Sequence, residues 1–99
     1  MFAVIYKMET KPGFQQTFEK AWHQLTKLIA KYEGGLGSRL HKESNLVYIA
    51  YAQWPNKETW ENSGDKLPPE ANEIRKIMRT ATEKIETIHT MQIVDDLLQ

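Results

Sequence analysis

Four side chains of this chain are suited to chemistry on a small organic molecule. Trp54 and Trp60 carry flat apolar rings on which a planar substrate can stack. Tyr6 can hydrogen-bond to a phenolic substrate, or deprotonate it if a nearby cation lowers the pKa of the Tyr6 hydroxyl. His89 lies among apolar residues, and an inward-pointing histidine can serve as a general base near neutral pH. Together they predict an apolar pocket with one or two polar groups.

The same side chains can instead be structural. Aromatic residues dominate the cores of small proteins, so both tryptophans can simply fill space. A tyrosine on a strand commonly buries its ring and turns its hydroxyl toward water. A lone histidine without a carboxylate nearby in sequence is commonly satisfied within the fold. The sequence leaves the choice between a functional and a structural role open.

The sequence does not indicate metal or phosphate chemistry. It has no cysteine, and no two of its three histidines lie three or four positions apart, as zinc ligands on a helix would. It contains neither the GxxxxGK[ST] phosphate-binding loop nor the GxSxG motif of hydrolases. Asp95 and Asp96 are adjacent, so on a strand they point to opposite faces and cannot form a catalytic pair. We therefore expect no metal and no cofactor.

The length and charge of the chain limit the classes of protein to which it can belong. Its 99 residues are enough for one domain, which we place at residues 1–99. Lys plus Arg and Asp plus Glu both number 13, whereas a nucleic-acid binder commonly shows a basic excess. The N-terminus lacks the basic and apolar regions of a signal peptide, and no apolar run reaches about 18 residues. We expect a cytoplasmic protein with no membrane and no nucleic-acid partner.

Hydrophobic periodicity predicts the elements that would position these side chains. Apolar residues recur at spacings of three and four from Phe14 to Glu33, the pattern of an amphipathic helix that Gly34 ends. Asn56, which follows Pro55, is suited to cap a short helix. The predicted strands are Phe2–Glu9, Leu36–Lys42, Leu46–Trp54 and Ile85–Leu98, and the predicted helices are Phe14–Glu33, Asn56–Asn62 and Glu70–Lys84.

This order of elements is that of the ferredoxin-like split βαβ fold. The fold is α+β, with a four-stranded antiparallel sheet and helices on one face. The predicted strand Leu46–Trp54 is apolar on both faces, whereas an antiparallel strand with one wet face should alternate. A second copy of the chain, related by a two-fold axis, would cover the face that the helices leave bare. We therefore expect a homodimer that forms through the sheet faces.

Several motifs resemble one known family over nearly the whole chain. Residues 12–22 follow a P-G-F-x-x-x-F-x-x-x-W pattern, and G-G-L-G-S-R-L-H occupies residues 34–41. A-Y-A-Q-W-P follows at residues 50–55 and E-T-W at residues 58–60. Together these motifs resemble the antibiotic biosynthesis monooxygenase-like family of dimeric α/β-barrel proteins.

The resemblance implies a homodimer whose two sheets meet as a barrel, with a pocket between each sheet and its helices. Some members are cofactor-free monooxygenases of aromatic polyketides, whose substrates form a carbanion that itself reacts with dioxygen. Asn56 and Trp60 resemble an Asn/Trp pair of such enzymes, although residues 63–69 lack the tyrosine found there. We expect a monooxygenase or related oxidoreductase acting on a small aromatic or quinone-like compound, with these catalytic residues: Tyr6, Asn56, Trp60 and His89.

Three alternatives use the same order of elements. A haem-degrading branch places a histidine on the helix that corresponds to Glu70–Lys84, which has none here, while haem binding through His41 or His89 stays open. A non-catalytic small-ligand binder or stress-related dimer would use the same pocket without turnover. An RNA-binding module would expose aromatic residues within a basic pattern that residues 46–54 lack.

Overall fold

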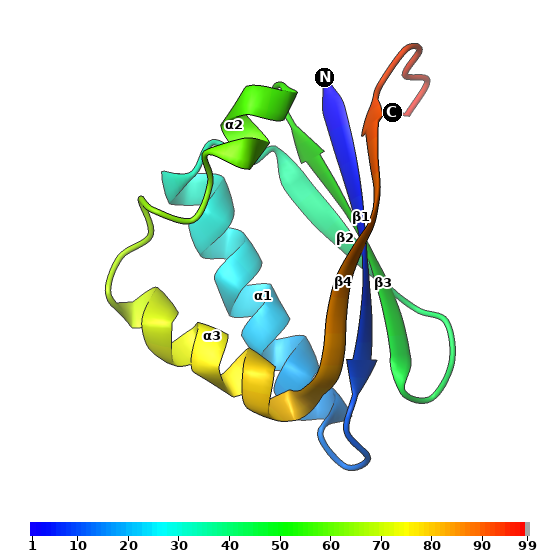
Figure 1. Cartoon of the computed structure of the whole chain (residues 1–99), viewed down its shortest axis with the longest axis vertical. Coiled ribbons are helices and arrows are strands. Elements are labelled where there is room, and N and C mark those ends of the chain that lie inside the picture. Colours follow the sequence, from blue (N-terminus) through cyan, green and yellow to red (C-terminus); the bar gives the residue numbers. More distant parts are fainter. Residues whose placement is uncertain (99) are drawn as a thin grey trace.

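The computed structural model describes residues 1–98 and shows the elements in the predicted order (Figure 1). The strands are β1 (Phe2–Thr10), β2 (Gly37–Lys42), β3 (Val47–Trp54) and β4 (Thr82–Gln92), and the helices are α1 (Gln15–Tyr32), α2 (Lys57–Glu61) and α3 (Glu70–Ala81). Gln99, the last residue of the predicted domain, lies outside the described residues. Within residues 1–98, every helix is too short or too polar to cross a membrane.

The four strands form one sheet in the order β2-β3-β1-β4, and all neighbouring pairs are antiparallel. The helices α1 and α3 both lie on one side of this sheet, as Figure 1 shows. We call the other side the open face. The predicted ferredoxin-like α+β fold is therefore confirmed, with its helices on one face of a four-stranded antiparallel sheet.

The core lies between the sheet and the two longer helices. Phe18 of α1 is fully buried and packs on Tyr48 of β3, with 4.9 Å between the ring centroids. Tyr48 donates its hydroxyl proton to Glu19 Oε2 at 2.5 Å. Burial, together with this carboxylate, raises the pKa of Tyr48 to about 12. The ring of Tyr48 thus fills the interior while its polar end is satisfied at the edge of the core.

The two sides of β3 differ in burial. The residues that face the helices are buried: Tyr48, Ala50, Ala52 and Trp54. The residues on the open face are half-buried: Val47, Ile49, Tyr51 and Gln53. Within a single chain, therefore, only the helix side of β3 is fully buried, and the expected burial of its other side is not found.

The predicted helix Glu70–Lys84 is too long, because α3 ends at Ala81 and β4 begins at Thr82. Thr82 has extended backbone angles, and its hydroxyl donates to the carbonyl of Met78 at 2.8 Å. It pairs with Thr10 at the end of β1. Residues 82–84 suit a helix or a strand by composition, so pairing with β1 decides between the two.

The predicted last strand, Ile85–Leu98, also extends too far at its C-terminal end. β4 stops at Gln92, which pairs with Phe2, the first residue of β1. One more backbone hydrogen bond joins the N–H of Ile93 to the carbonyl of Met1. The described pairing of β4 with β1 ends at this point.

A β-bulge in β4 decides which way His89 points. The pairing with β1 shifts between Ile5 and Tyr6, so that His89 lies opposite Ile5 and Thr87 lies opposite Tyr6. Directly paired residues lie on the same face of a sheet. His89 is therefore on the open face, where its side chain is exposed. The expectation of an inward His89 is not met, because a simple alternation of residues cannot reveal a bulge.

Candidate functional site

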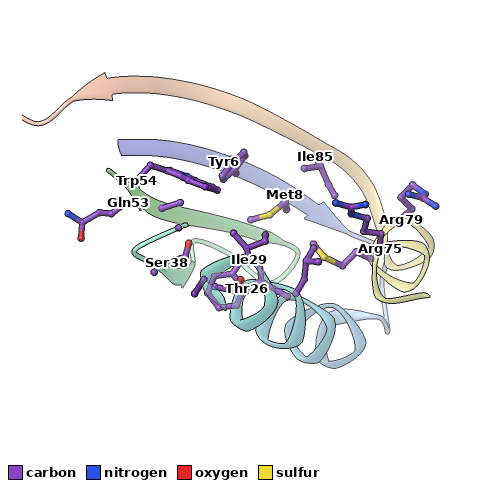
Figure 2. A pocket seen from close by; sticks show the side chains of 17 residues that line it. Tyr6, Met8, Thr26, Ile29, Ser38, Gln53, Trp54, Arg75, Arg79 and Ile85 are labelled. Carbon is purple, nitrogen blue, oxygen red and sulfur yellow. The ribbon is translucent and has the colours of Figure 1, made fainter. Parts of the chain in front are cut away.

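A cavity of about 290 Å³ lies between the sheet and the helices α1 and α3 (Figure 2). Most of the side chains that line it are apolar or aromatic, among them Tyr6, Met8, Trp22, Ile29, Trp54 and Met78. Proteins commonly bind small organic molecules in apolar cavities that contain a few polar groups. The cavity is therefore the candidate binding site.

Tyr6 and Trp60 meet at the edge of this cavity. The indole Nε1–H of Trp60, on α2, donates a hydrogen bond to the Tyr6 hydroxyl oxygen at 2.8 Å. The Trp60 ring also packs on Phe2 at the start of β1, with 5.8 Å between centroids. Tyr6 lines the cavity, whereas Trp60 does not and reaches it only through this hydrogen bond. The structure thus brings two of the predicted site residues into contact.

The environment of Tyr6 keeps its hydroxyl protonated. Burial raises the pKa of Tyr6 above its ordinary value, and the hydrogen bond from Trp60 opposes only part of this rise. The condition under which Tyr6 could deprotonate a substrate, a pKa lowered by a nearby cation, is therefore not met. Within residues 1–98, the Tyr6 hydroxyl accepts from Trp60 but donates to no protein group. Tyr6 is thus suited to donate its proton to a ligand rather than to act as a base.

Trp54 forms one end of the cavity wall in the view of Figure 2. Only 4% of this residue is exposed, and within the described part of the chain its Nε1–H has no hydrogen-bond partner. Leaving such a donor unpaired costs about 1–3 kcal/mol. Trp54, one of the two tryptophans on which the sequence predicts that a substrate could stack, thus lies in the wall of the cavity.

Asn56 acts as a helix cap. Its Oδ1 atom accepts hydrogen bonds from the backbone N–H and the hydroxyl of Thr59, both at 2.8 Å. The predicted capping of α2 is confirmed. Asn56 is exposed and does not line the cavity, and His89 lies on the open face. Of the four predicted catalytic residues, the structure therefore joins Tyr6 with Trp60 and leaves the other two apart from them.

Two arginines of α3, Arg75 and Arg79, also line the cavity, and neither is among the site residues predicted from the sequence. They lie four residues apart and flank Met78, which is buried. That spacing is the signal that could have found them, because residues i and i+4 share one face of a helix. The sequence alone could not show that this face meets a cavity.

Glu33 fixes the loop between α2 and α3 beside this site. Its buried carboxylate accepts hydrogen bonds from the N–H of Gly64 and, at 2.7 Å, from the N–H of Lys66. The carbonyl of Gly64 in turn accepts a hydrogen bond from Arg75 Nη2 at 3.0 Å. The position of Arg75 therefore depends on a loop that is held by a buried carboxylate.

The chemistry open to the cavity is that of stacking and hydrogen bonding. None of the lining residues is a histidine, aspartate or glutamate. In the part of the chain that the structure describes, no group of three or more potential metal ligands lies together. The Tyr6 hydroxyl and the two arginines are the strongest hydrogen-bond donors in the lining.

Comparisons with known proteins are consistent with this architecture. The model of the family described as antibiotic biosynthesis monooxygenase matches residues 1–65. A search of curated proteins found no match.

Solved structures with the same fold span almost the whole chain. SnoaB, a cofactor-independent oxygenase from Streptomyces nogalater, is 14% identical over 99% of this chain and 98% of its own, with a TM-score of 0.75. Rv0793 from Mycobacterium tuberculosis is 9% identical over 98% of both chains, with a TM-score of 0.74. A conserved protein from Methanosarcina mazei Go1 is 18% identical over 92% of this chain and 90% of its own, with a TM-score of 0.72. At these identities the likeness shows the fold.

Proposed function

This chain belongs to the antibiotic biosynthesis monooxygenase family, and on that premise we propose that it is a cofactor-independent monooxygenase of a small aromatic or quinone-like compound. The observation that carries the proposal is the apolar cavity with the Tyr6 hydroxyl at its edge, protonated and free to donate. The likeness in fold to SnoaB, a cofactor-independent oxygenase, supports the same class of reaction.

The proposed reaction needs a substrate with an acidic CH₂ group that is conjugated to a carbonyl through an aromatic ring, as in anthrone. Loss of a proton to water gives a carbanion, whose charge is shared with the carbonyl oxygen. The carbanion adds O₂ to form a peroxide anion, which takes up a proton and then loses water to leave a ketone. In sum, CH₂ and O₂ give C=O and H₂O. Tyr6 would donate a hydrogen bond to the charged carbonyl oxygen and so stabilise the carbanion.

Oxygen uptake with anthrone, in the absence of added flavin and metal, tests the proposal. We expect uptake above the spontaneous rate, with one O₂ consumed per anthraquinone formed. The same chain after heat denaturation is the control for trace catalysts. A rate equal to that of buffer alone, across a panel of anthrones and hydroquinones, would count against a monooxygenase.

One observation favours a second candidate, a binding protein without turnover. The lining of the cavity offers no carboxylate or imidazole that could remove a proton from the ligand. Such a protein, including a stress-related dimer, would be stabilised against heat by the ligand but would consume no oxygen. Thermal stabilisation by anthrone under nitrogen, combined with no uptake in air, would identify it.

We also propose that a second copy of this chain covers the open face. Apolar side chains lie at the centre of that face, where Ile5 of β1 pairs with Tyr51 of β3 and Ile49 is half-buried nearby. The charged or polar residues Lys7, Arg39 and His41 flank them. A hollow on this face is lined in part by Ile5, Ile49 and Tyr51. A two-fold axis would place the two apolar surfaces against each other.

A further inference from the structure

Two positive charges line a cavity that is otherwise largely apolar. Arg75 and Arg79 come from α3, and in Figure 2 they lie away from Trp54, with Tyr6 and Met8 between. Arg75 is half-buried and Arg79 is exposed. The cavity therefore has an aromatic end and a cationic end.

Neither guanidinium group is neutralised by the protein. Within residues 1–98, no carboxylate lies within 4.0 Å of Arg75 or Arg79, and the ion pair found there joins Lys84 to Glu86. Arg75 uses one N–H of Nη2 for the carbonyl of Gly64. Arg79 makes no hydrogen bond to a described residue. Most of the donors of both groups are thus free to bind a ligand.

The spacing of the two arginines favours one anionic partner. Residues four apart on a helix are neighbours, so two like charges there repel each other unless an anion lies between them. A guanidinium group presents paired N–H donors whose geometry matches that of a carboxylate. An apolar wall beside such a pair would exclude water and strengthen the interaction.

We propose that the cavity binds an organic anion, namely a flat apolar compound whose carboxylate is held by Arg75 and Arg79. The ring system would lie between Trp54, Tyr6 and Met8, and the carboxylate would lie at the surface of α3. Arg75 and Arg79 are then the residues that select acids over neutral compounds of the same shape. The inference rests on the proposed function in placing the ligand in this cavity, but it does not require catalysis.

Calorimetric titration with 2-naphthoate and 2-naphthamide tests the proposal, because the two probes have the same shape and differ in charge. We expect the wild-type chain to bind 2-naphthoate on the order of tenfold more tightly than 2-naphthamide. Arg79→Gln should abolish most of this preference, because it should weaken the binding of 2-naphthoate and leave the binding of 2-naphthamide unchanged. Arg79 makes no hydrogen bond to a described residue, so the variant should fold normally.

Lys76→Gln is the matched control, because Lys76 lies on α3 between the two arginines, is exposed and does not line the cavity. It should leave the preference unchanged although it removes the same charge. The proposal would be overturned if the wild type bound the two probes equally or bound neither. It would also be overturned if Arg79→Gln and Lys76→Gln lost the preference for 2-naphthoate to the same extent. Oxygen uptake with anthrone is a separate readout: turnover without acid preference would refute this inference alone, and acid preference without turnover would refute the monooxygenase alone.

Discussion

Tyr6→Phe should lower the rate of oxygen-dependent turnover of anthrone on the order of 100-fold, as the loss of one donor to a developing oxyanion commonly does. The substitution removes the hydroxyl that accepts from Trp60 at 2.8 Å and that is free to donate to a ligand. The ring that lines the cavity remains, so binding of the apolar part of the substrate should change little. Rates from an oxygen electrode, together with the dissociation constant under nitrogen, separate the two effects.

Trp60→Phe is the matched control for that experiment. It removes the same hydrogen bond from the other side but leaves the Tyr6 proton in place, so turnover should fall only a few-fold. The pH profile gives a second readout. Because burial raises the pKa of Tyr6, its donating form persists throughout the neutral and mildly alkaline range, and turnover should be lost only as the pH rises above that raised pKa. Full activity of Tyr6→Phe would show that this hydroxyl has no part in the reaction.

Ile49→Glu should convert a dimer into monomers, weakening self-association on the order of 100-fold or more. Ile49 lies near the centre of the open face, between Lys7 of β1 and His41 of β2. In a two-fold dimer both copies would bury the new carboxylate together with Lys7, and the cost of removing these charges from water can exceed what their attraction returns. In a single chain the carboxylate would lie beside Lys7 in water, so the fold should survive.

Sedimentation equilibrium over a range of concentrations measures this effect. Ile77→Glu is the control, since Ile77 is also partly exposed but lies on α3, away from the open face. We expect Ile77→Glu to sediment as the wild type does, and Ile49→Glu to sediment as a chain of 11.6 kDa. A wild-type chain that is already monomeric at high concentration would refute the dimer directly.

Much of the fold could be predicted because single elements carry strong periodic signals. The helix predicted at Phe14–Glu33 is found at Gln15–Tyr32, since its apolar stripe is long and Gly34 ends it with a positive φ of 79°. The boundary between α3 and β4 could not be predicted. Residues 82–84 become strand because the end of β1 needs a partner, and only the tertiary fold supplies that requirement.

The candidate site was less accessible to prediction. The sequence singles out Tyr6 and Trp60, but their hydrogen bond joins residues 54 positions apart, and nothing local specifies it. His89 was placed on the wrong face because the bulge opposite Ile5 and Tyr6 shifts the register of β4. Arg75 and Arg79 look like ordinary surface charges until α3 is seen to lie against a cavity.

The binding of a ligand in the cavity between sheet and helices can be measured with the methionines of the chain as reporters. Met8 and Met78 line the cavity, whereas Met1 and Met91 are exposed, and Met91 lies on the open face opposite Ala3. With ¹³C-labelled methionine methyl groups and anthrone added under nitrogen, ring currents should shift the signals of Met8 and Met78 and leave those of Met1 and Met91 in place. A shift of Met91 with Met8 and Met78 unmoved would place the ligand on the open face and contradict the account.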